Sequence, residues 1–140
     1  MAPHRDAARA DRPCPVQFSR TIHLDSARVR FGRQYPQVGF DAFSVRLDAA
    51  GRSVGYSADL GCAGELRKLC ARPLDVLVTE LAHFHPERLV DALRGRNVKH
   101  LVVTHMARQA REQLPAVRVC LRRLRSIRVR FAADGDVIKI

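Results

Sequence analysis

Short apolar stretches of two kinds run along this chain, and their spacing predicts which are strands and which are helices. In one kind, apolar residues alternate with polar ones or form a short unbroken run, as in β-strands. In the other kind they recur about every three or four residues, as on one face of an α-helix. The pattern predicts strands over 16–22, 40–47, 53–57, 74–79, 100–104, 127–131 and 137–140, and helices over 64–71, 86–93 and 115–124.

Turn residues separate these stretches and fix their order. Asp48-Ala-Ala-Gly51 predicts a hairpin turn between two strands. Pro86 suits the first turn of a helix, and Gly95 lies just past the end of that helix. Strands that alternate with helices predict an α/β domain, with about three helices packed on a mixed β-sheet. Residues 1–15 have no apolar period, so we expect a disordered leader before a domain over 16–140.

Three polar residues follow directly after predicted strands. They are His23, Asp59 and His105. Side chains at the ends of neighbouring strands can converge above a sheet, and imidazole nitrogen and carboxylate oxygen are common ligands of a catalytic zinc ion. The other interpretation is that these are ordinary polar residues, which any α/β protein has at its strand ends.

Several segments resemble motifs of the metallo-β-lactamase superfamily, in the same order and at a fitting spacing. Residues 56–61 (YSADLG) resemble its Y-S-G-D-x-G segment, and 75–80 (DVLVTE) resemble D-x-L-x-x-E with a histidine nearby. Residues 101–105 (LVVTH) resemble L-x-x-T-H, and 133–138 (ADGDVI) match the usual closing strand. The resemblance covers 16–140 and implies the C-terminal half of an αββα sandwich from a metal-dependent hydrolase.

The resemblance also assigns metal ligands. It implies that Asp59 bridges two zinc ions, that His23 in the segment TIHL binds one ion, and that His105 binds the other. Water or hydroxide between the ions would be the nucleophile, because the metal charge lowers its pKa. Ala58 stands where the family has glycine before the aspartate, and this difference tightens the turn slightly.

Glu80, His83 and His85 each have two interpretations. The resemblance implies that Glu80 and one of the two histidines do not bind the metal themselves but orient its ligands or the substrate. Without it, Glu80 is an acidic residue at a helix N-terminus, where the helix dipole favours negative charge. The two histidines are then surface residues near the cap of the helix that begins at Pro86.

The first metal motif of the family, H-x-H-x-D-H, does not occur in this sequence. That motif supplies four ligands, and the three that remain cannot give each of two zinc ions its usual three protein contacts. We therefore expect a truncated or degenerate hydrolase that is inactive alone. Half of a sandwich leaves an apolar sheet face uncovered, so the expected partner is a missing N-terminal half or a second copy of the chain.

The charge of the chain suggests an alternative function. The net charge is +11, and all but three of the 25 basic residues are arginines. Arginines crowd the stretch 108–130, which would attract a phosphate backbone. The alternative is thus a non-enzymatic nucleic-acid-binding module, or else a solvated helix face whose arginine stems cover apolar surface. The residues that would contact nucleic acid are Arg118, Arg122, Arg123 and Arg125.

No apolar run is long enough to cross a bilayer, and the first residues lack the pattern of a secretory signal peptide. We therefore expect a cytoplasmic protein without a membrane partner. The four cysteines are scattered and form no C-x-x-C pair. This spacing predicts small, mostly buried thiols rather than zinc ligands.

Overall fold

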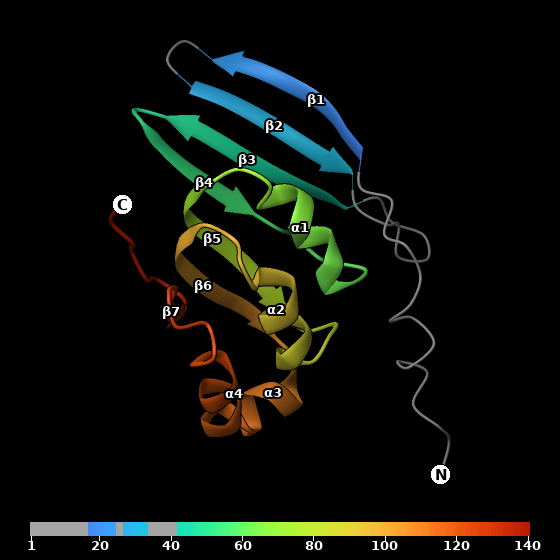
Figure 1. The fold of residues 1–140 in the computed structure, drawn as a ribbon, viewed down its shortest axis with the longest axis vertical. Coiled ribbons are helices and arrows are strands. Elements are labelled where there is room, and N and C mark those ends of the chain that lie inside the picture. The colour runs from blue at the N-terminus through green and yellow to red at the C-terminus, as the bar shows by residue number, and fades with distance from the viewer. Residues whose placement is uncertain (1–16, 25–26, 34–41) are drawn as a thin grey trace.

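The computed structural model describes residues 17–24, 27–33 and 42–140, and these form a mixed sheet with helices on one side (Figure 1). The predicted leader over 1–15 lies outside the described residues. Within the described part, the α/β class expected from the sequence is confirmed.

The strands of the sheet stand side by side in sequence order. The first four pair antiparallel, and from the fourth strand onward each pairs parallel to the next. A helix connects the parallel strands, as such crossovers require. The strands are β1 (Gln17–Leu24), β2 (Ala27–Arg33), β3 (Phe43–Ala49), β4 (Arg52–Tyr56), β5 (Leu74–Leu81), β6 (Val98–Met106) and β7 (Arg128–Phe131).

The helices pack on one face of the sheet and share a single core with it. Their apolar residues, such as Leu66, Leu89 and Leu121, are buried together with Leu77 and Leu101 of the central strands. Proline begins α2, as its sequence predicts, and the helix ends before Gly95, whose φ is +72°. The helices are η2 (Ala63–Glu65), a 3-10 turn that leads into α1 (Leu66–Leu69), α2 (Pro86–Leu93), α3 (Arg108–Glu112) and α4 (Leu114–Leu121).

Three elements differ from the sequence-based expectation. β2 was not expected, although Ala27, Val29 and Phe31 alternate with polar residues and glycine as in a strand. The helix α3 was not expected either, and none of its residues is buried. The expected closing strand over 137–140 does not form, because the chain after β7 makes a turn at Gly135 and continues without strand pairing.

In β3 the polar side chains lie on the buried face and the apolar ones on the exposed face, which is the reverse of the usual arrangement. Ser44 and Arg46 point to the helix side and are buried. Arg46 is accommodated there because its guanidinium group pairs with Asp48 and donates hydrogen bonds to two backbone carbonyls before β5. Burial acts to raise the pKa of Asp48, but hydrogen bonds from Arg46 and Ser53 outweigh it, so that the pKa is lowered.

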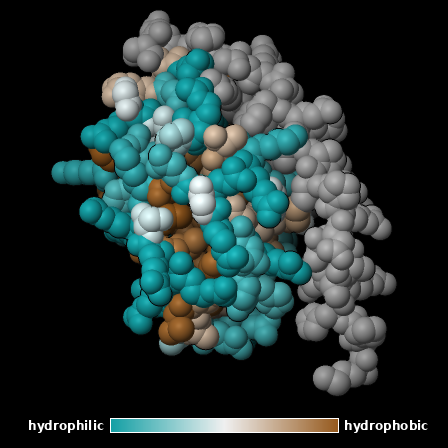
Figure 2. Space-filling view, in the orientation of Figure 1, coloured by the Kyte–Doolittle hydropathy of each residue, from teal (hydrophilic) through white to brown (hydrophobic). Residues whose placement is uncertain are grey.

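The apolar side chains of β3 and β4 lie on the other face of the sheet. Phe43, Leu47 and Tyr56 share that face by the strand register, and they are 40%, 37% and 48% exposed. No helix of the described residues covers them, since all the helices pack against the opposite face. By contrast, the face of the molecule that Figure 2 shows is mostly hydrophilic. We refer to Phe43, Leu47 and Tyr56 as the open sheet face.

The cysteines are only partly as expected. Cys70 is a buried free thiol, and burial raises its pKa to about 12, which makes it a poor nucleophile. Cys120 is also free and half-buried. Cys62 is disulfide-bonded, which corrects the expectation of a thiol at that position.

None of the described helices has both the length and the apolar character needed to cross a bilayer.

Candidate metal centre

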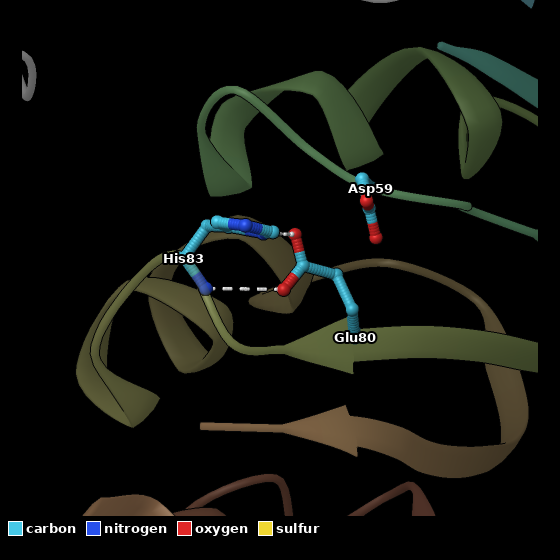
Figure 3. A group of neighbouring side chains, drawn as sticks. All are labelled: Asp59, Glu80 and His83. Atoms are coloured by element: carbon cyan, nitrogen blue, oxygen red, sulfur yellow. Dashed lines mark hydrogen bonds and ion pairs between the residues drawn. The ribbon is translucent and has the colours of Figure 1, made fainter. Parts of the chain in front are cut away.

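Four polar side chains gather where β4, β5 and β6 end. These three strands are parallel, so their carboxyl ends lie at one edge of the sheet. Asp59 lies on the loop after β4, Glu80 near the end of β5, His83 on the loop after β5, and His105 near the end of β6. Figure 3 shows Asp59, Glu80 and His83 of this group, and the side chain of Asp59 extends from its loop toward the end of β5.

The carboxylate of Glu80 is the buried centre of the group, with the residue 2% exposed. Its Oε1 accepts a hydrogen bond from the backbone N–H of Leu60 at 2.8 Å, and its Oε2 accepts from Ala82 at 2.6 Å and from His83 at 3.1 Å. Glu80 therefore ties the loop after β4 to the loop after β5. It does not lie at a helix N-terminus, because α2 begins only at Pro86.

Glu80 also holds the ring of His83. The Nδ1 atom of His83 lies 2.8 Å from Oε1 of Glu80 (Figure 3). When the carboxylate accepts a hydrogen bond from Nδ1, the lone pair of the neutral ring is on Nε2. A carboxylate that accepts a hydrogen bond from one ring nitrogen commonly orients an imidazole whose other nitrogen binds a metal or accepts a proton.

Asp59 and His105 form a second pair of the same kind beside the first. Oδ1 of Asp59 lies 3.0 Å from Nδ1 of His105, and both side chains are more than half exposed. The rings of His83 and His105 meet edge to face, with their centroids 5.8 Å apart. One ligand atom each of Asp59, Glu80 and His83 lies within 4.8 Å of the other two, which is close enough for a shared cation.

The backbone is strained at two residues of this edge. Ala58 has a φ of +51° and His105 a φ of +41°, both in the left-handed region that residues with a Cβ seldom adopt. His105 is the extra residue of a β-bulge, because Glu80 pairs with Thr104 and Leu81 with Met106. Bulges and strained residues of this kind are concentrated next to functional sites, where they redirect a side chain.

The structure does not bring His23 to this group. His23 stands opposite Arg28, which in turn pairs with Asp48, and Asp48 pairs with Ser53 at the start of β4. These paired residues lie at the end of the sheet where β4 begins. Asp59 lies at the opposite end, because it follows the end of β4. From strand spacing and rise, His23 is about 30 Å from His105, which contacts Asp59. The topology thus keeps Asp59 and His105 together and separates His23 from both.

His85 is also outside the group. It is the N-cap of α2, is exposed, and makes no side-chain capping bond. Of the two histidines proposed to orient ligands, only His83 contacts Glu80. The sequence shows that His83 lies three residues after Glu80. It does not predict the loop conformation that brings the ring of His83 to the carboxylate.

The four arginines of the nucleic-acid alternative lie on α4 and just after it. The guanidinium group of Arg118 lies 4.6 Å from the ring centroid of Phe131, so a cation–π contact engages it. Arg122, Arg123 and Arg125 are exposed.

Comparison with solved structures shows which fold this is. The metallo-β-lactamase fold protein YhfI from Bacillus subtilis superimposes with a TM-score of 0.69 over 86% of this chain, at 14% sequence identity. The chain has half of the metallo-β-lactamase fold. It covers only 52% of the YhfI chain. No family model and no curated protein matches the sequence.

A second structure with the metallo-β-lactamase fold gives the same result. A putative zinc-dependent hydrolase of the metallo-β-lactamase superfamily from Thermotoga maritima matches 74% of this chain with a TM-score of 0.53 and 14% identity. This chain covers 57% of that protein. The chain therefore spans about half the length of both solved structures, and the likeness establishes the fold.

The side chains at the carboxyl ends of these strands carry atoms of the types that bind zinc. Carboxylate oxygen and imidazole nitrogen are both zinc ligands. Asp59, His83 and His105 are exposed donors, whereas both oxygens of Glu80 already accept hydrogen bonds from the loops. The described residues thus offer a second oxygen of Asp59 and the Nε2 atoms of His83 and His105 to a metal, and the buried carboxylate of Glu80 supports His83 and the loop of Asp59.

Proposed function

We propose that this chain supplies part of a metal-dependent hydrolytic centre, in which Asp59 and His105 bind zinc and the Glu80–His83 pair lies beside them. The observation that supports this most is the convergence of the four side chains at the carboxyl ends of three parallel strands. The likeness to a putative zinc-dependent hydrolase supports the same class of reaction.

The residues of the centre have separate roles in this proposal. Bound zinc would supply a water molecule of lowered pKa. Asp59 and His105 hold the metal, and Glu80 fixes both the loop that carries Asp59 and the tautomer of His83. His83 then has Nε2 available to accept a proton or to orient a substrate oxygen.

Turnover needs more ligands than this chain provides. Its sequence contains no H-x-H-x-D-H motif, and His23 lies at the opposite edge of the sheet. The open sheet face is the surface on which a second layer would pack, because its apolar side chains lack a cover within the described residues. We infer that a separate N-terminal half, or a second copy of the chain, covers this face and completes the centre.

Zinc content is the direct test of the ligands. We expect the purified chain to hold close to one zinc ion by elemental analysis, and Asp59→Ala and His105→Ala to lose it. His85→Ala removes an exposed histidine outside the group and should keep the metal. Absence of zinc from the wild type, or retention in both ligand variants, would contradict the proposal.

Hydrolysis of bis-p-nitrophenyl phosphate tests the incompleteness of the centre. We expect no robust turnover by the zinc-loaded chain alone. Fast turnover that His105→Ala abolishes would show that the chain is a complete enzyme and that a second half is unnecessary.

A further inference from the structure

Four arginines surround a hollow on the outside of the helices. The hollow has a volume of about 520 Å³ and is lined by Arg67 of α1, Arg88 of α2, Arg94 and Arg96 after it, together with Asp91 and Ala92. Four arginines and one aspartate give the lining a net charge of +3. This surface is distinct from the four arginines on and just after α4 and from the metal centre, and we refer to it as the arginine hollow.

The arginine hollow is poorly neutralised by the protein itself. Asp91 pairs with Arg94 at 3.1 Å, and both side chains are at least half exposed, so the pair is weak. Within the described ranges, no acidic side chain forms an ion pair with Arg67, Arg88 or Arg96. Like charges held together in this way repel each other, and an anion would remove that repulsion.

The core holds the backbone of the two helices that carry Arg67 and Arg88, and Arg94 and Arg96 lie on the turn directly after α2. α2 is anchored by Leu89, Val90 and Leu93, each at most 2% exposed, and α1 is anchored by Leu66 and Leu69. The backbone positions of the arginines are therefore set by the core, and only their side chains move. The guanidinium groups are thus confined to one region of the surface, although their side chains still lose rotamer freedom when they bind a ligand.

The lining indicates the chemistry of the ligand. A pocket for a small organic molecule is lined mainly by apolar and aromatic groups, whereas Ala92 is the only apolar side chain here. Guanidinium groups bind phosphate oxygens in a bidentate manner. Because no aromatic ring lines the hollow, it offers no platform on which a base could stack.

We propose that the arginine hollow binds the phosphate backbone of a nucleic-acid strand without reading its bases. The hollow is open to solvent, so a strand can continue beyond it in both directions. The net charge of +11 on the whole chain attracts such a polyanion from a distance. The proposal does not depend on the metal centre.

Fluorescence anisotropy with a labelled RNA of about 20 nucleotides tests the proposal on the full chain. With about three net phosphate contacts on a single strand, the slope of log Kd against log salt should have a magnitude of about 2. Arg67→Gln/Arg88→Gln/Arg96→Gln should weaken binding about tenfold or more at about 50 mM salt and flatten the slope. DNA of the same sequence, poly-U and poly-A should bind within about threefold of one another, because backbone contacts carry no base information.

The matched control is Arg122→Gln/Arg123→Gln/Arg125→Gln, which removes the same charge from the segment directly after α4. We expect it to keep the affinity within about twofold. Equal losses in the two triple variants would mean diffuse attraction, and a loss only in the control would place binding on α4. Either result overturns the proposal, as does a strong base preference or binding to phosphatidylserine vesicles but not to RNA.

Discussion

At the scale of single residues, the backbone of Ala58 is strained. Its φ of +51° places the Cβ close to the carbonyl oxygen, which costs about 1 to 2 kcal/mol in an L-residue. The strain is adjacent to Asp59 and therefore sets the direction in which the proposed ligand leaves its loop. The family motif that the sequence resembles has glycine at this position, and the structure supplies the physical reason.

Ala58→Gly should stabilise the chain by up to about 1 kcal/mol, since the left-handed strain outweighs the extra freedom of glycine in the unfolded chain. The free energy of unfolding from urea titration measures this. Ala116→Gly is the control, because Ala116 is exposed within α4 and the same change there should destabilise by about 1 kcal/mol. A loss of stability in both variants would contradict the left-handed conformation of Ala58.

At the scale of elements, one buried carboxylate connects two loops. The backbone N–H groups of Leu60, Ala82 and His83 all donate to Glu80, so the loops after β4 and β5 share a single acceptor. Glu80 therefore has a structural role that does not depend on a metal. The loops and the ligand are therefore coupled through Glu80.

Glu80→Ala should lower the free energy of unfolding by about 3 kcal/mol, because it leaves buried or half-buried N–H groups without an acceptor. It should also reduce zinc content, since the loop that carries Asp59 loses its anchor. Glu112→Ala breaks only the exposed pair with Arg108 and should change stability by no more than about 0.5 kcal/mol. Unchanged unfolding of Glu80→Ala would show that the carboxylate is dispensable to the loops.

The sequence predicts individual elements well and their spatial relation less well. α2 begins and ends where its proline and glycine predict, and β5 and β6 follow their apolar runs. His23 was grouped with Asp59 because both follow strands, but strand direction is set by pairing across the sheet, which a local pattern does not contain. The contact between Glu80 and His83 depends on the path of a loop, and the burial of Arg46 depends on carbonyls 26 and 27 residues away.

At the scale of the whole molecule, the described helices cover one side of the sheet. Phe43, Leu47 and Tyr56 make the open sheet face apolar, and large apolar patches on folded proteins mark interfaces. Leu47 and Tyr56 lie on adjacent strands, so that they form a continuous surface with the residues between them. The chain alone should therefore associate with itself through this face.

Sedimentation velocity over a range of protein concentrations should show dimers or larger species for the wild type. Leu47→Lys/Tyr56→Lys should shift the distribution to monomer, because two charges oppose burial of the face. Val119→Lys alters an exposed apolar residue on α4 and should leave association as it is. A wild type that stays monomeric at every concentration would exclude the second copy as the cover.

The order of the strands has a consequence for how the chain folds. Each strand of the described sheet pairs with the strand next to it in the sequence, so no pairing waits for a strand made much later. The entropy cost of closing a loop grows only slowly with its length, so the helical crossovers between the parallel strands add little to that cost. As the chain leaves the ribosome, each new strand can therefore dock on the one made just before it, and the sheet grows in the order of synthesis.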